Sequence, residues 1–233
     1  MQIEPIATLH SCFGEKFAVP RQPGLCPSAW GRVVLSPEHS NSDCLRGIEG
    51  FSHLWLIFGF HLTAEQGWSP TVRPPRLGGN EKVGVFASRS TFRPNGLGLS
   101  LVKLDCVTDT ADGAVLEVSG VDLVDGTPIF DIKPYLPYAE SQPEALGGYA
   151  AEAPPRIPVE GLENLAGMDE RDLRVVEEVL SLDPRPPAGR DEPDRVFGAY
   201  LCGRNVRFRF VRSIDGEGLT CQVVDSQEIS LGD

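Results

Sequence analysis

The hydrophobic pattern of the first 140 residues is that of a β protein. Short apolar runs are separated by clusters of Gly, Pro, Asn and Asp, which favour turns. Along residues 102–106, Lys103 and Asp105 alternate with apolar residues, the period of two expected of a strand with one buried face. No segment before residue 160 has a strong helical period, so we predict a closed or nearly closed barrel rather than a layered α/β sheet. Strands are expected at Ile3–Leu9, Trp30–Leu35, Ser52–Phe60, Val83–Ala87, Leu99–Val107, Ala114–Val118 and Pro128–Lys133.

A helix and further strands are expected after residue 160. Asp169 is a suitable helix N-cap, because acidic residues fill the turn that follows it. Leu173, Val176 and Leu180 then recur at helical spacing, and Asp183-Pro184 ends the helix. The strands are expected at Val196–Cys202, Val206–Val211 and near Leu219–Val224, the first two joined in a hairpin at Gly203-Arg204-Asn205.

The stretch between these two regions resembles a loosely packed connection, because residues 139–158 are rich in Ala, Pro, Gly and Glu. We therefore predict a mainly β chain in three parts. They are an N-terminal β-barrel domain in residues 1–140, a linker in 141–160 and a small α+β C-terminal domain in 161–233.

Composition points to a soluble cytoplasmic protein. The chain has 233 residues, 41% of them hydrophobic, and its longest apolar run, Leu54–Phe60, is far shorter than the ~20 residues of a membrane span. The N-terminus lacks the basic and apolar regions of a secretory signal, so no membrane partner is expected. The six cysteines stand singly, which predicts free thiols and neither a disulfide framework nor a metal site.

Charge is unevenly distributed along the chain. A net charge of -12 argues against a protein that coats nucleic acid by bulk charge. Residues 73–99, however, carry five basic side chains and one acidic one, whereas residues 152–195 carry twelve acidic side chains and six arginines. A focused basic patch for nucleic acid is therefore possible.

A shaped loop is predicted at Glu15–Gly24. Pro20 and Pro23 fix φ and remove two backbone donors, so this segment cannot be a regular helix or central strand. Arg21 and Gln22 on such a loop suit recognition of a carboxylate, a phosphate or a base edge. The alternative is a turn with incidental polar residues.

A basic, glycine- and proline-rich stretch spans Val72–Ser100. Stiff proline-flanked loops would present its arginines from ordered backbone, although a solvated basic loop remains the alternative. The order of residues in a P-loop is absent, which argues against a nucleoside triphosphate site. Before this stretch, His61 ends an apolar strand where barrel sites open, whereas His53 inside that strand is typical of a core histidine.

Three carboxylates are close in sequence near residue 126. Asp122, Asp125 and Asp131 are followed by Lys133 and Tyr135. Such a set could be a proton-transfer cluster, a ligand for a cationic or hydroxylated small molecule, or a divalent metal site. It could also be turn chemistry with a lysine ion pair.

Five segments of the chain together resemble one family. EKFAVPRQPG, FSHLW, TVRPPRLGGN, GVFASRSTFRPN and DLVDGTPIFDIKPYLPY resemble the TsaA-like family, specifically the TrmO-type tRNA methyltransferases. The match spans about residues 1–140, and DPRP (Asp183–Pro186) and NVRFRF (Asn205–Phe210) resemble that subfamily's C-terminal appendage. Two departures are FRPNGLG in place of FRPNPIG, which puts Gly96 where a proline is usual, and ASRS in place of ATRS.

The resemblance implies a function and a cofactor. It implies an S-adenosylmethionine-dependent methyltransferase built on a β-barrel and acting as a homodimer, with no metal. The substrate would be N6-threonylcarbamoyladenosine at position 37 of threonine tRNA, methylated at N6. Carried over by position, the residues expected to bind the cofactor are Arg21, Gln22, Pro23, His61, Leu62, Arg89, Leu99, Asp122, Leu123, Val124 and Asp125.

Catalytic and RNA-binding residues are predicted beside the cofactor set. The acceptor nitrogen is a weak nucleophile, because its lone pair is delocalised into the purine and the carbamoyl group, so a base is wanted. Asp131, Lys133 and Tyr135 are the candidates for that role or for orienting the substrate. The anticodon stem-loop of tRNA would be held at its phosphates by Arg73, Arg76, Arg93, Arg207 and Arg209.

Two other interpretations of the sequence stay open. One is a non-catalytic module that binds S-adenosylmethionine or a nucleotide, which would need no proton-transfer group. The other is a metal-dependent hydrolase that uses Asp122, Asp125 and His61.

Overall fold

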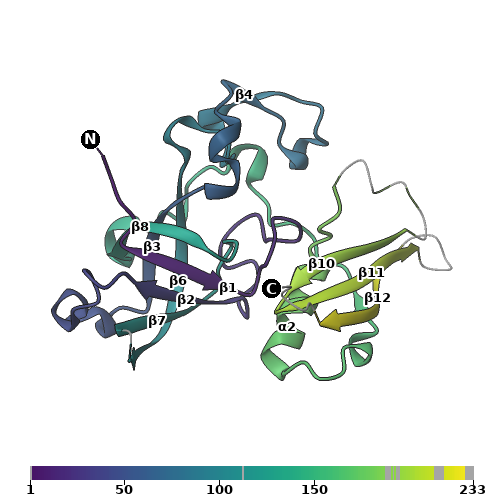
Figure 1. Ribbon diagram of the computed structural model, residues 1–233. Helices are drawn as coiled ribbons and strands as arrows, with labels where there is room; N and C mark the ends of the chain where they lie inside the picture. The colour runs from purple at the N-terminus through teal and green to yellow at the C-terminus, as the bar shows by residue number, and fades with distance from the viewer. Residues whose placement is uncertain are drawn as a thin grey trace. The chain divides into compact units, whose positions relative to one another are not determined.

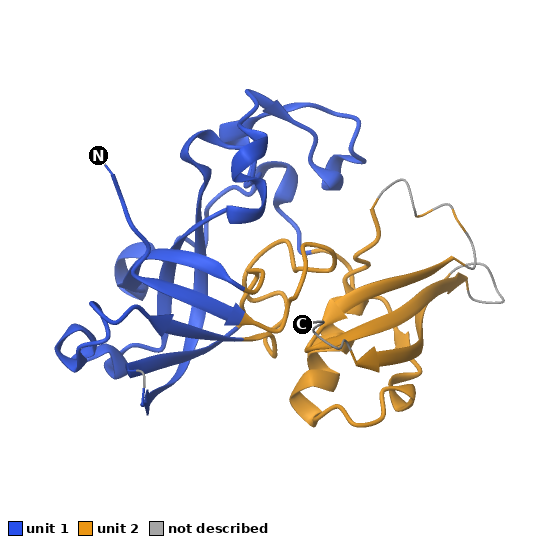
Figure 2. Cartoon of the chain, viewed as in Figure 1, with its two compact units in different colours: residues 1–10, 31–119, 126–153 blue, residues 11–30, 120–125, 154–233 orange. Residues whose placement is uncertain are grey.

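The computed structural model describes residues 2–111, 113–186, 190, 192, 195–212 and 218–228. The chain forms two compact units, each discontinuous in sequence (Figure 2). Unit 1 comprises residues 1–10, 31–119 and 126–153, and unit 2 comprises residues 11–30, 120–125 and 154–233. The division into a barrel domain, a linker and a C-terminal domain remains a prediction.

Among the described residues, six strands close a barrel in the order β1-β2-β7-β6-β3-β8, and these strands belong to unit 1 except for Ser11 and Trp30 (Figure 1). This confirms the predicted mainly β fold with an N-terminal barrel. The barrel strands are β1 (Ala7–Ser11), β2 (Trp30–Leu35), β3 (His53–Gly59), β6 (Leu97–Thr110), β7 (Gly113–Ser119) and β8 (Thr127–Pro134).

Strand β3 shows why the barrel has a packed interior. Leu54, Leu56 and Phe58 are buried, whereas the residues between them, among them Trp55 and Ile57, are only half-buried. Side chains alternate between the two faces of a strand, so the first set faces the core and the second faces outward. Strand β3 is paired antiparallel with β6 on one side and β8 on the other.

A glycine in β6 makes room for a core ring. Gly98 is the cross-strand partner of Phe58, and a Cβ atom at Gly98 would overlap the Phe58 ring. The ring can therefore lie across the neighbouring strand only because position 98 has no side chain.

A bulge in β8 sets the direction of its polar residues. Phe58 of β3 pairs with Ile129, whereas Ile57 pairs with Asp131, so the register shifts by one residue between them. Such an extra residue reverses which face the following side chains occupy. Ile129 therefore faces the core, and Asp131 faces outward on the same side as Ile57.

A small lobe extends from the barrel strands within unit 1 (Figure 1). We call residues 68–93 the β4–β5 lobe, since β4 (Thr71–Val72) and β5 (Val83–Gly84) pair antiparallel within it. The remainder of the lobe consists of single-turn 3-10 helices and loops. A short helix, α1 (Pro137–Glu140), follows β8 in the same unit.

Unit 2 is a four-stranded sheet with one longer helix, together with two loops from earlier in the chain. The strand order is β10-β11-β12-β9, in which β9 is parallel to β12 and the other pairs are antiparallel. The elements are β9 (Val159–Glu160), α2 (Glu170–Ser181), β10 (Val196–Leu201), β11 (Arg204–Arg212) and β12 (Leu219–Glu228).

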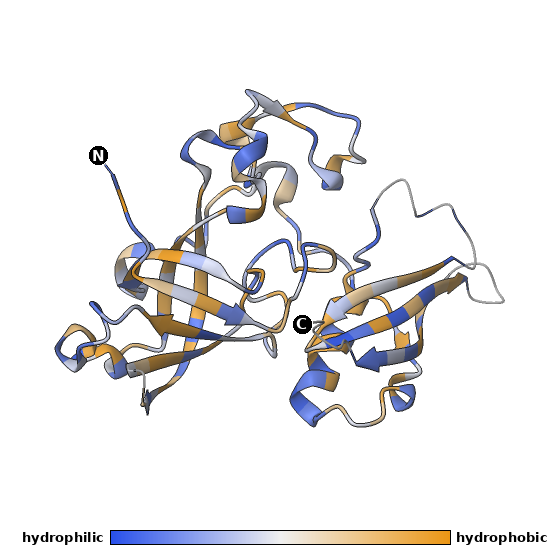
Figure 3. Cartoon of the chain, in the orientation of Figure 1, coloured by the Kyte–Doolittle hydropathy of each residue, from blue (hydrophilic) through white to orange (hydrophobic). Residues whose placement is uncertain are grey.

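Helix α2 confirms the prediction for this region. Asp169 is the N-cap, and its carboxylate accepts a hydrogen bond from the backbone N–H of Asp172 at 2.8 Å. Val175, Val176 and Val179 form a buried face, while the side of α2 toward the viewer in Figure 3 is hydrophilic. This amphipathic pattern is why the helix packs within unit 2.

The hairpin between β10 and β11 is present, but its turn was placed wrongly by the sequence. The turn residues are Cys202 and Gly203, with φ of 51° and 75°, and β11 already begins at Arg204. Two consecutive positive φ values match the twist of a two-residue hairpin turn, and they favour glycine at one position.

Several strand limits also differ from prediction. Strand β1 begins at Ala7 rather than Ile3, and β5 ends at Gly84, where a 3-10 turn takes over. Strands β4 and β9, of two residues each, were not predicted, because so short a run carries no periodicity. In the described residues, no helix is both long and apolar enough to cross a membrane.

Candidate active site and RNA-binding residues

The outer face of strands β6, β3 and β8 carries predicted residues of two kinds. Ile57 of β3 pairs with Leu99 of β6 and with Asp131 of β8, so these three side chains form one row across the sheet. Adjacent strands lie about 4.8 Å apart, which separates the Leu99 and Asp131 backbones by only about 10 Å. Leu99 is 52% exposed, as expected of a residue available to a ligand. A predicted cofactor residue and a predicted catalytic residue thus share one surface.

The predicted catalytic residues lie together on this face. Nζ of Lys133 lies 2.9 Å from Oδ2 of Asp131, and both side chains are substantially exposed. Trp55 is the cross-strand partner of Lys133, and the Tyr135 ring meets the Trp55 ring edge-on at a centroid distance of 6.0 Å. The structure therefore brings Asp131, Lys133 and Tyr135 together along the end of β8.

Two residues that were not predicted position this cluster. Glu140 of α1 accepts hydrogen bonds from the indole N–H of Trp55 at 2.9 Å and from the backbone N–H of Leu136 at 2.8 Å. His53 stacks edge-on against Tyr135 at 6.4 Å, and its backbone carbonyl accepts the Tyr135 N–H at 3.0 Å. His53 thus contacts the candidate catalytic residue Tyr135, which its place on an apolar strand did not indicate.

Further predicted cofactor residues lie where β3 ends and β6 begins. His61 and Leu62 open a 3-10 helix directly after β3, and both are exposed. The preceding Phe60 donates its backbone N–H to the carbonyl of Gly96 at 2.8 Å, so this helix is tied to the loop before β6. Arg89 is also exposed and lies in the β4–β5 lobe of the same unit.

Gly96 has a backbone conformation that proline cannot adopt. Its φ is 58°, whereas the proline ring holds φ near −65°. Its backbone N–H also donates to the carbonyl of Arg93 at 3.1 Å, and proline has no such donor. The loop in this chain is therefore built around the glycine that replaces the family's usual proline.

In unit 2, the segment of residues 11–30, which contains the PRQP loop (Pro20–Pro23), is hydrogen-bonded to the segment of residues 120–125. The N–H of Gly24 donates to the carbonyl of Gly120 at 2.9 Å, and the N–H of Asp125 donates to the carbonyl of Phe13 at 2.8 Å. The predicted cofactor residues Arg21, Gln22, Pro23, Asp122, Leu123, Val124 and Asp125 are thus carried by two adjacent segments, although they are about 100 positions apart in sequence.

Ser11 connects these two segments directly. Its backbone N–H donates to Oδ1 of Asp125 at 3.0 Å, and its hydroxyl donates to the carbonyl of Leu123 at 2.7 Å. Leu123 itself is buried, so its side chain packs in the unit while Asp122 and Val124 are half-buried. Ser11 was not predicted, since a single serine at the end of a strand carries no sequence signal.

The loop of residues 11–30 also contacts helix α2 within unit 2. The indole N–H of Trp30 donates to Oδ1 of Asp172 at 2.8 Å. The backbone N–H and the hydroxyl of Ser28 both donate to the carboxylate of Glu178 at 2.9 Å. These bonds hold the base of the PRQP loop on a rigid element.

The predicted RNA-binding arginines of unit 1 have different surroundings. Arg73 is exposed, whereas the guanidinium of Arg93 is half-buried and donates to the carbonyl of Ser88 at 3.1 Å. Arg76 donates to the backbone carbonyl of Glu152. Arg93 and Arg76 thus help to hold loops in place, and each keeps other guanidinium N–H groups that could donate to phosphate.

The two arginines of β11 lie opposite its buried residues. Val206, Phe208 and Phe210 are buried, so Arg207 and Arg209 are on the outer face. Arg207 forms an ion pair with Asp225 at 3.2 Å, and Arg209 hydrogen-bonds to Oε1 of Gln222. The ion pair reduces the positive charge that Arg207 could offer to a phosphate.

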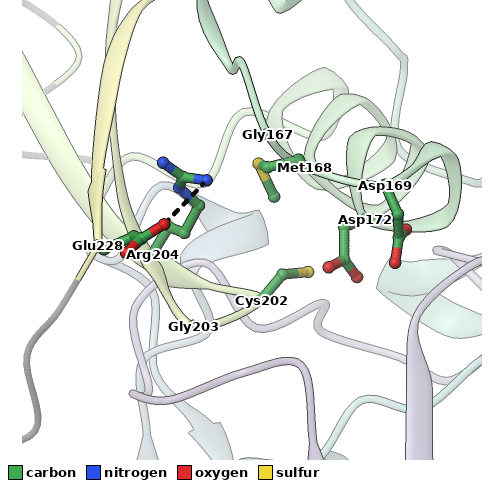
Figure 4. A pocket seen from close by; sticks show the side chains of 8 residues that line it. All are labelled: Gly167, Met168, Asp169, Asp172, Cys202, Gly203, Arg204 and Glu228. Atoms are coloured by element: carbon green, nitrogen blue, oxygen red, sulfur yellow. Dashed lines mark hydrogen bonds and ion pairs between the residues drawn. The ribbon is translucent and has the colours of Figure 1, made fainter.

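A pocket in unit 2 contains none of the predicted residues (Figure 4). It has a volume of about 410 Å³, and the cross-strand partners Arg204 and Glu228 lie side by side on one wall, 3.8 Å apart. The Cys202 thiol points toward Asp172 of α2. The remaining lining residues are Gly167, Met168, Asp169 and Gly203.

The buried thiols of unit 2 are poor nucleophiles. Burial raises the pKa of Cys26 and of Cys221 to about 12. A hydrogen bond with the Cys12 thiol, and then burial, raise the pKa of Cys202 as well. Within the described part of the chain, the cysteines are free, and no group of three or more His, Cys, Asp or Glu side chains is placed to hold a metal ion.

Comparisons with known proteins identify the family. Residues 8–141 match the model of the tRNA-methyltransferase O N-terminal domain, and residues 160–224 match that of the TrmO C-terminal domain. The chain is 48% identical over 217 residues to the tRNA (adenine(37)-N6)-methyltransferase of Escherichia coli strain K12, covering 89% of this chain and 92% of that protein. It is similar to the crystal structure of TrmO from Pseudomonas aeruginosa, with a TM-score of 0.75, 35% identity and coverage of 97% and 98% of the two chains. Because both family models match, the chain belongs to the tRNA-methyltransferase O family.

Proposed function

We propose that this protein is an S-adenosylmethionine-dependent tRNA methyltransferase that modifies N6 of adenosine 37. The E. coli relative is named tRNA (adenine(37)-N6)-methyltransferase, and this chain matches both family models. The structural observation that carries the proposal is the row Leu99, Ile57 and Asp131, which sets a predicted cofactor residue and a predicted catalytic residue on one face.

The residues predicted to bind the cofactor fit its chemistry. A Pseudomonas aeruginosa relative, 44% identical over 218 residues, is named as an S-adenosylmethionine-dependent methyltransferase. Arg21 offers a guanidinium for the cofactor's carboxylate, and Asp122 offers a carboxylate for hydroxyl groups or for a sulfonium. The exposed Leu99 offers apolar surface. When bound, S-adenosylmethionine would supply the methyl group as an electrophile to a correctly placed nitrogen.

The chain's own residues would control the proton on the acceptor nitrogen. Oδ2 of Asp131 lies 2.9 Å from Nζ of Lys133, and the Asp131 carboxylate can accept the N6 proton. Lys133 can then donate a hydrogen bond to an oxygen of the modified base, where negative charge grows as the proton leaves. Tyr135, held by His53 and Trp55, would orient the base through its ring or its hydroxyl.

The finer assignments are also part of the proposal. We infer that the adenosine carries a threonylcarbamoyl group, that threonine tRNA is the substrate, and that the enzyme works as a cytoplasmic homodimer. A threonylcarbamoyl oxygen would give Lys133 a partner close to N6. The resemblance supports the homodimer, which is tested by sedimentation at several protein concentrations.

Methyl transfer to purified RNA tests the function. The protein would be incubated with methyl-labelled S-adenosylmethionine and tRNA from cells that lack this protein, and the nucleosides analysed by mass spectrometry. Label in methylated threonylcarbamoyladenosine supports the proposal. Asp131→Asn and Lys133→Ala should lower kcat by about 100-fold, the usual scale for removing a proton-transfer group. The matched control, Lys103→Ala, removes an exposed lysine on the same face and should leave kcat unchanged.

The main alternative is a module that binds the cofactor without catalysis. The same assay separates the two, since a binding module would retain labelled cofactor but would leave the tRNA unlabelled. If the Asp131→Asn, Lys133→Ala and Tyr135→Phe variants all still label tRNA as the wild type does, the three residues are not catalytic. The methyltransferase function would then still stand.

A further inference from the structure

The β4–β5 lobe exposes three large aromatic side chains. Trp68 is 60% exposed, Phe86 79% and Phe92 37%. A single exposed apolar residue is ordinary on a protein surface, whereas several close together mark a binding site.

Backbone hydrogen bonds bring the three residues into one part of the lobe. The N–H of Ser69, which follows Trp68, donates to the carbonyl of Phe92 at 3.2 Å. The N–H of Val85, which precedes Phe86, donates to the carbonyl of Pro70 at 3.0 Å. Both Phe86 and Phe92 are thus anchored beside the short segment that begins at Trp68.

The same lobe carries a concentrated positive charge. Its charged residues are five basic and one acidic, within a chain of net charge -12. Arg73 and Lys82 are exposed, and in the part of the chain that the structure describes neither has an ion-pair partner. The lobe thus combines rings that can stack with cations that can contact phosphates.

We propose that this lobe binds unpaired nucleotides of the RNA substrate, with bases stacked on Trp68, Phe86 and Phe92 and phosphates contacted by Arg73 and Lys82. The proposal rests on the tRNA methyltransferase function argued above and adds the three aromatic residues to it. Single-stranded RNA is recognised in this way, because its bases are free to stack on aromatic rings and each base brings a negative phosphate. A double helix keeps its bases stacked inside, so the rings would give it little affinity.

Charge favours RNA over a second copy of the lobe. Two lobes of the same positive charge would repel each other on approach, whereas an RNA strand is attracted. Trp68 and Phe86 are mostly exposed, so replacing either ring should leave the fold intact.

Binding measurements on the full chain test the proposal. The probe is a fluorescent anticodon stem-loop RNA without modification, compared with a fully base-paired RNA of equal length. Phe86→Ala and Trp68→Ala should each raise the Kd for the stem-loop by about ten-fold, which is about 1.4 kcal/mol. The Kd for the paired RNA should barely change. Phe86→Trp should retain stem-loop affinity, because it keeps an aromatic ring.

Matched measurements separate stacking from other effects. Tyr138→Ala, at an aromatic residue that is 89% exposed outside the lobe, should leave stem-loop binding unchanged. Lys82→Ala should reduce the salt dependence of binding by about one phosphate contact, whereas Phe86→Ala should not alter it. In each of these variants, the affinity for S-adenosylmethionine and the melting temperature of the protein should be the same as in the wild type.

Two results would overturn the proposal. One is unchanged stem-loop affinity in both aromatic variants. The other is loss of self-association in sedimentation, with unchanged RNA affinity per chain, which would identify the rings as a contact between copies. Failure of the proposed function is distinct, because the wild-type protein would then not methylate tRNA at all.

Discussion

The backbone N–H of Ser11 donates a hydrogen bond to Oδ1 of Asp125 at 3.0 Å, across 114 positions of sequence. Together with the bond from the Ser11 hydroxyl to the carbonyl of Leu123, it joins the end of β1 to the turn predicted to bind the cofactor. Asp125 therefore holds the turn in shape, in addition to any direct contact with a ligand.

Replacing Asp125 should weaken both folding and cofactor binding. Asp125→Ala removes the acceptor for the Ser11 N–H, and the loss of that hydrogen bond should cost about 1 kcal/mol of unfolding free energy. Asp125→Asn keeps an oxygen at this position and should retain most of the stability. Urea unfolding measures the stability and calorimetry the cofactor affinity. Equal stability of wild type and Asp125→Ala would show that the Ser11 bond does not hold the turn.

Gly98 is expected to tolerate no side chain. Gly98→Ala places a methyl group where the Phe58 ring lies and should destabilise the protein by about 1–3 kcal/mol, the usual cost of overpacking a core. Gly84→Ala is the matched control, because a Cβ atom there meets no atom within 4 Å. Adding Phe58→Leu to Gly98→Ala should recover part of the loss in thermal unfolding. If the double variant is no more stable than Gly98→Ala, the new methyl group does not clash with the Phe58 ring.

Gly96 should be replaceable by asparagine but not by proline. Gly96→Pro cannot adopt a φ of 58° and also loses the bond to the Arg93 carbonyl, so it should cost more than about 1 kcal/mol. Gly96→Asn can reach the left-handed region and keeps the N–H, so its cost should be smaller. Denaturant midpoints of the two variants give the comparison. A proline variant as stable as the wild type would mean that this loop readily adopts another conformation.

Alkaline pH should destabilise the protein through its buried thiols. The pKa of Cys26 and of Cys221 is about 12 in the folded state and about 9 for a free thiol, so the folded state keeps these protons after the unfolded state has lost them. The unfolding free energy should therefore fall as pH rises above about 9, by about 1.4 kcal/mol per pH unit for each thiol.

Unfolding at pH 8–11 measures this dependence. Cys26→Ala and Cys221→Ala should each flatten the slope, whereas Cys106→Ala, at an exposed cysteine, should leave it unchanged. Equal slopes in all three variants would show that the alkaline loss comes from other groups.

Much of the fold followed from local sequence. The N-cap at Asp169 and the apolar spacing after it placed α2 within a residue or two, because capping and helical periodicity are properties of neighbouring residues. The alternation of Lys103 and Asp105 with Val102 and Leu104 marked β6 as a strand with one buried face for the same reason. Residue types and their spacing singled out candidates such as Arg21, Asp122 and Lys133, and the family resemblance assigned them to a cofactor or to catalysis.

The tertiary structure decided how those residues are used. Whether Asp131 faces the core or the outside depends on a bulge opposite Ile57, and a bulge is defined by pairing with another strand. The pairing of Leu99, Ile57 and Asp131 in one row likewise depends on strand register, and the Ser11–Asp125 bond on two distant segments meeting. Sequence by itself therefore determined which elements form and which chemistry they carry, because those depend on neighbouring residues. Only the tertiary structure determined which side chains share a surface, because that depends on contacts between segments far apart in the chain.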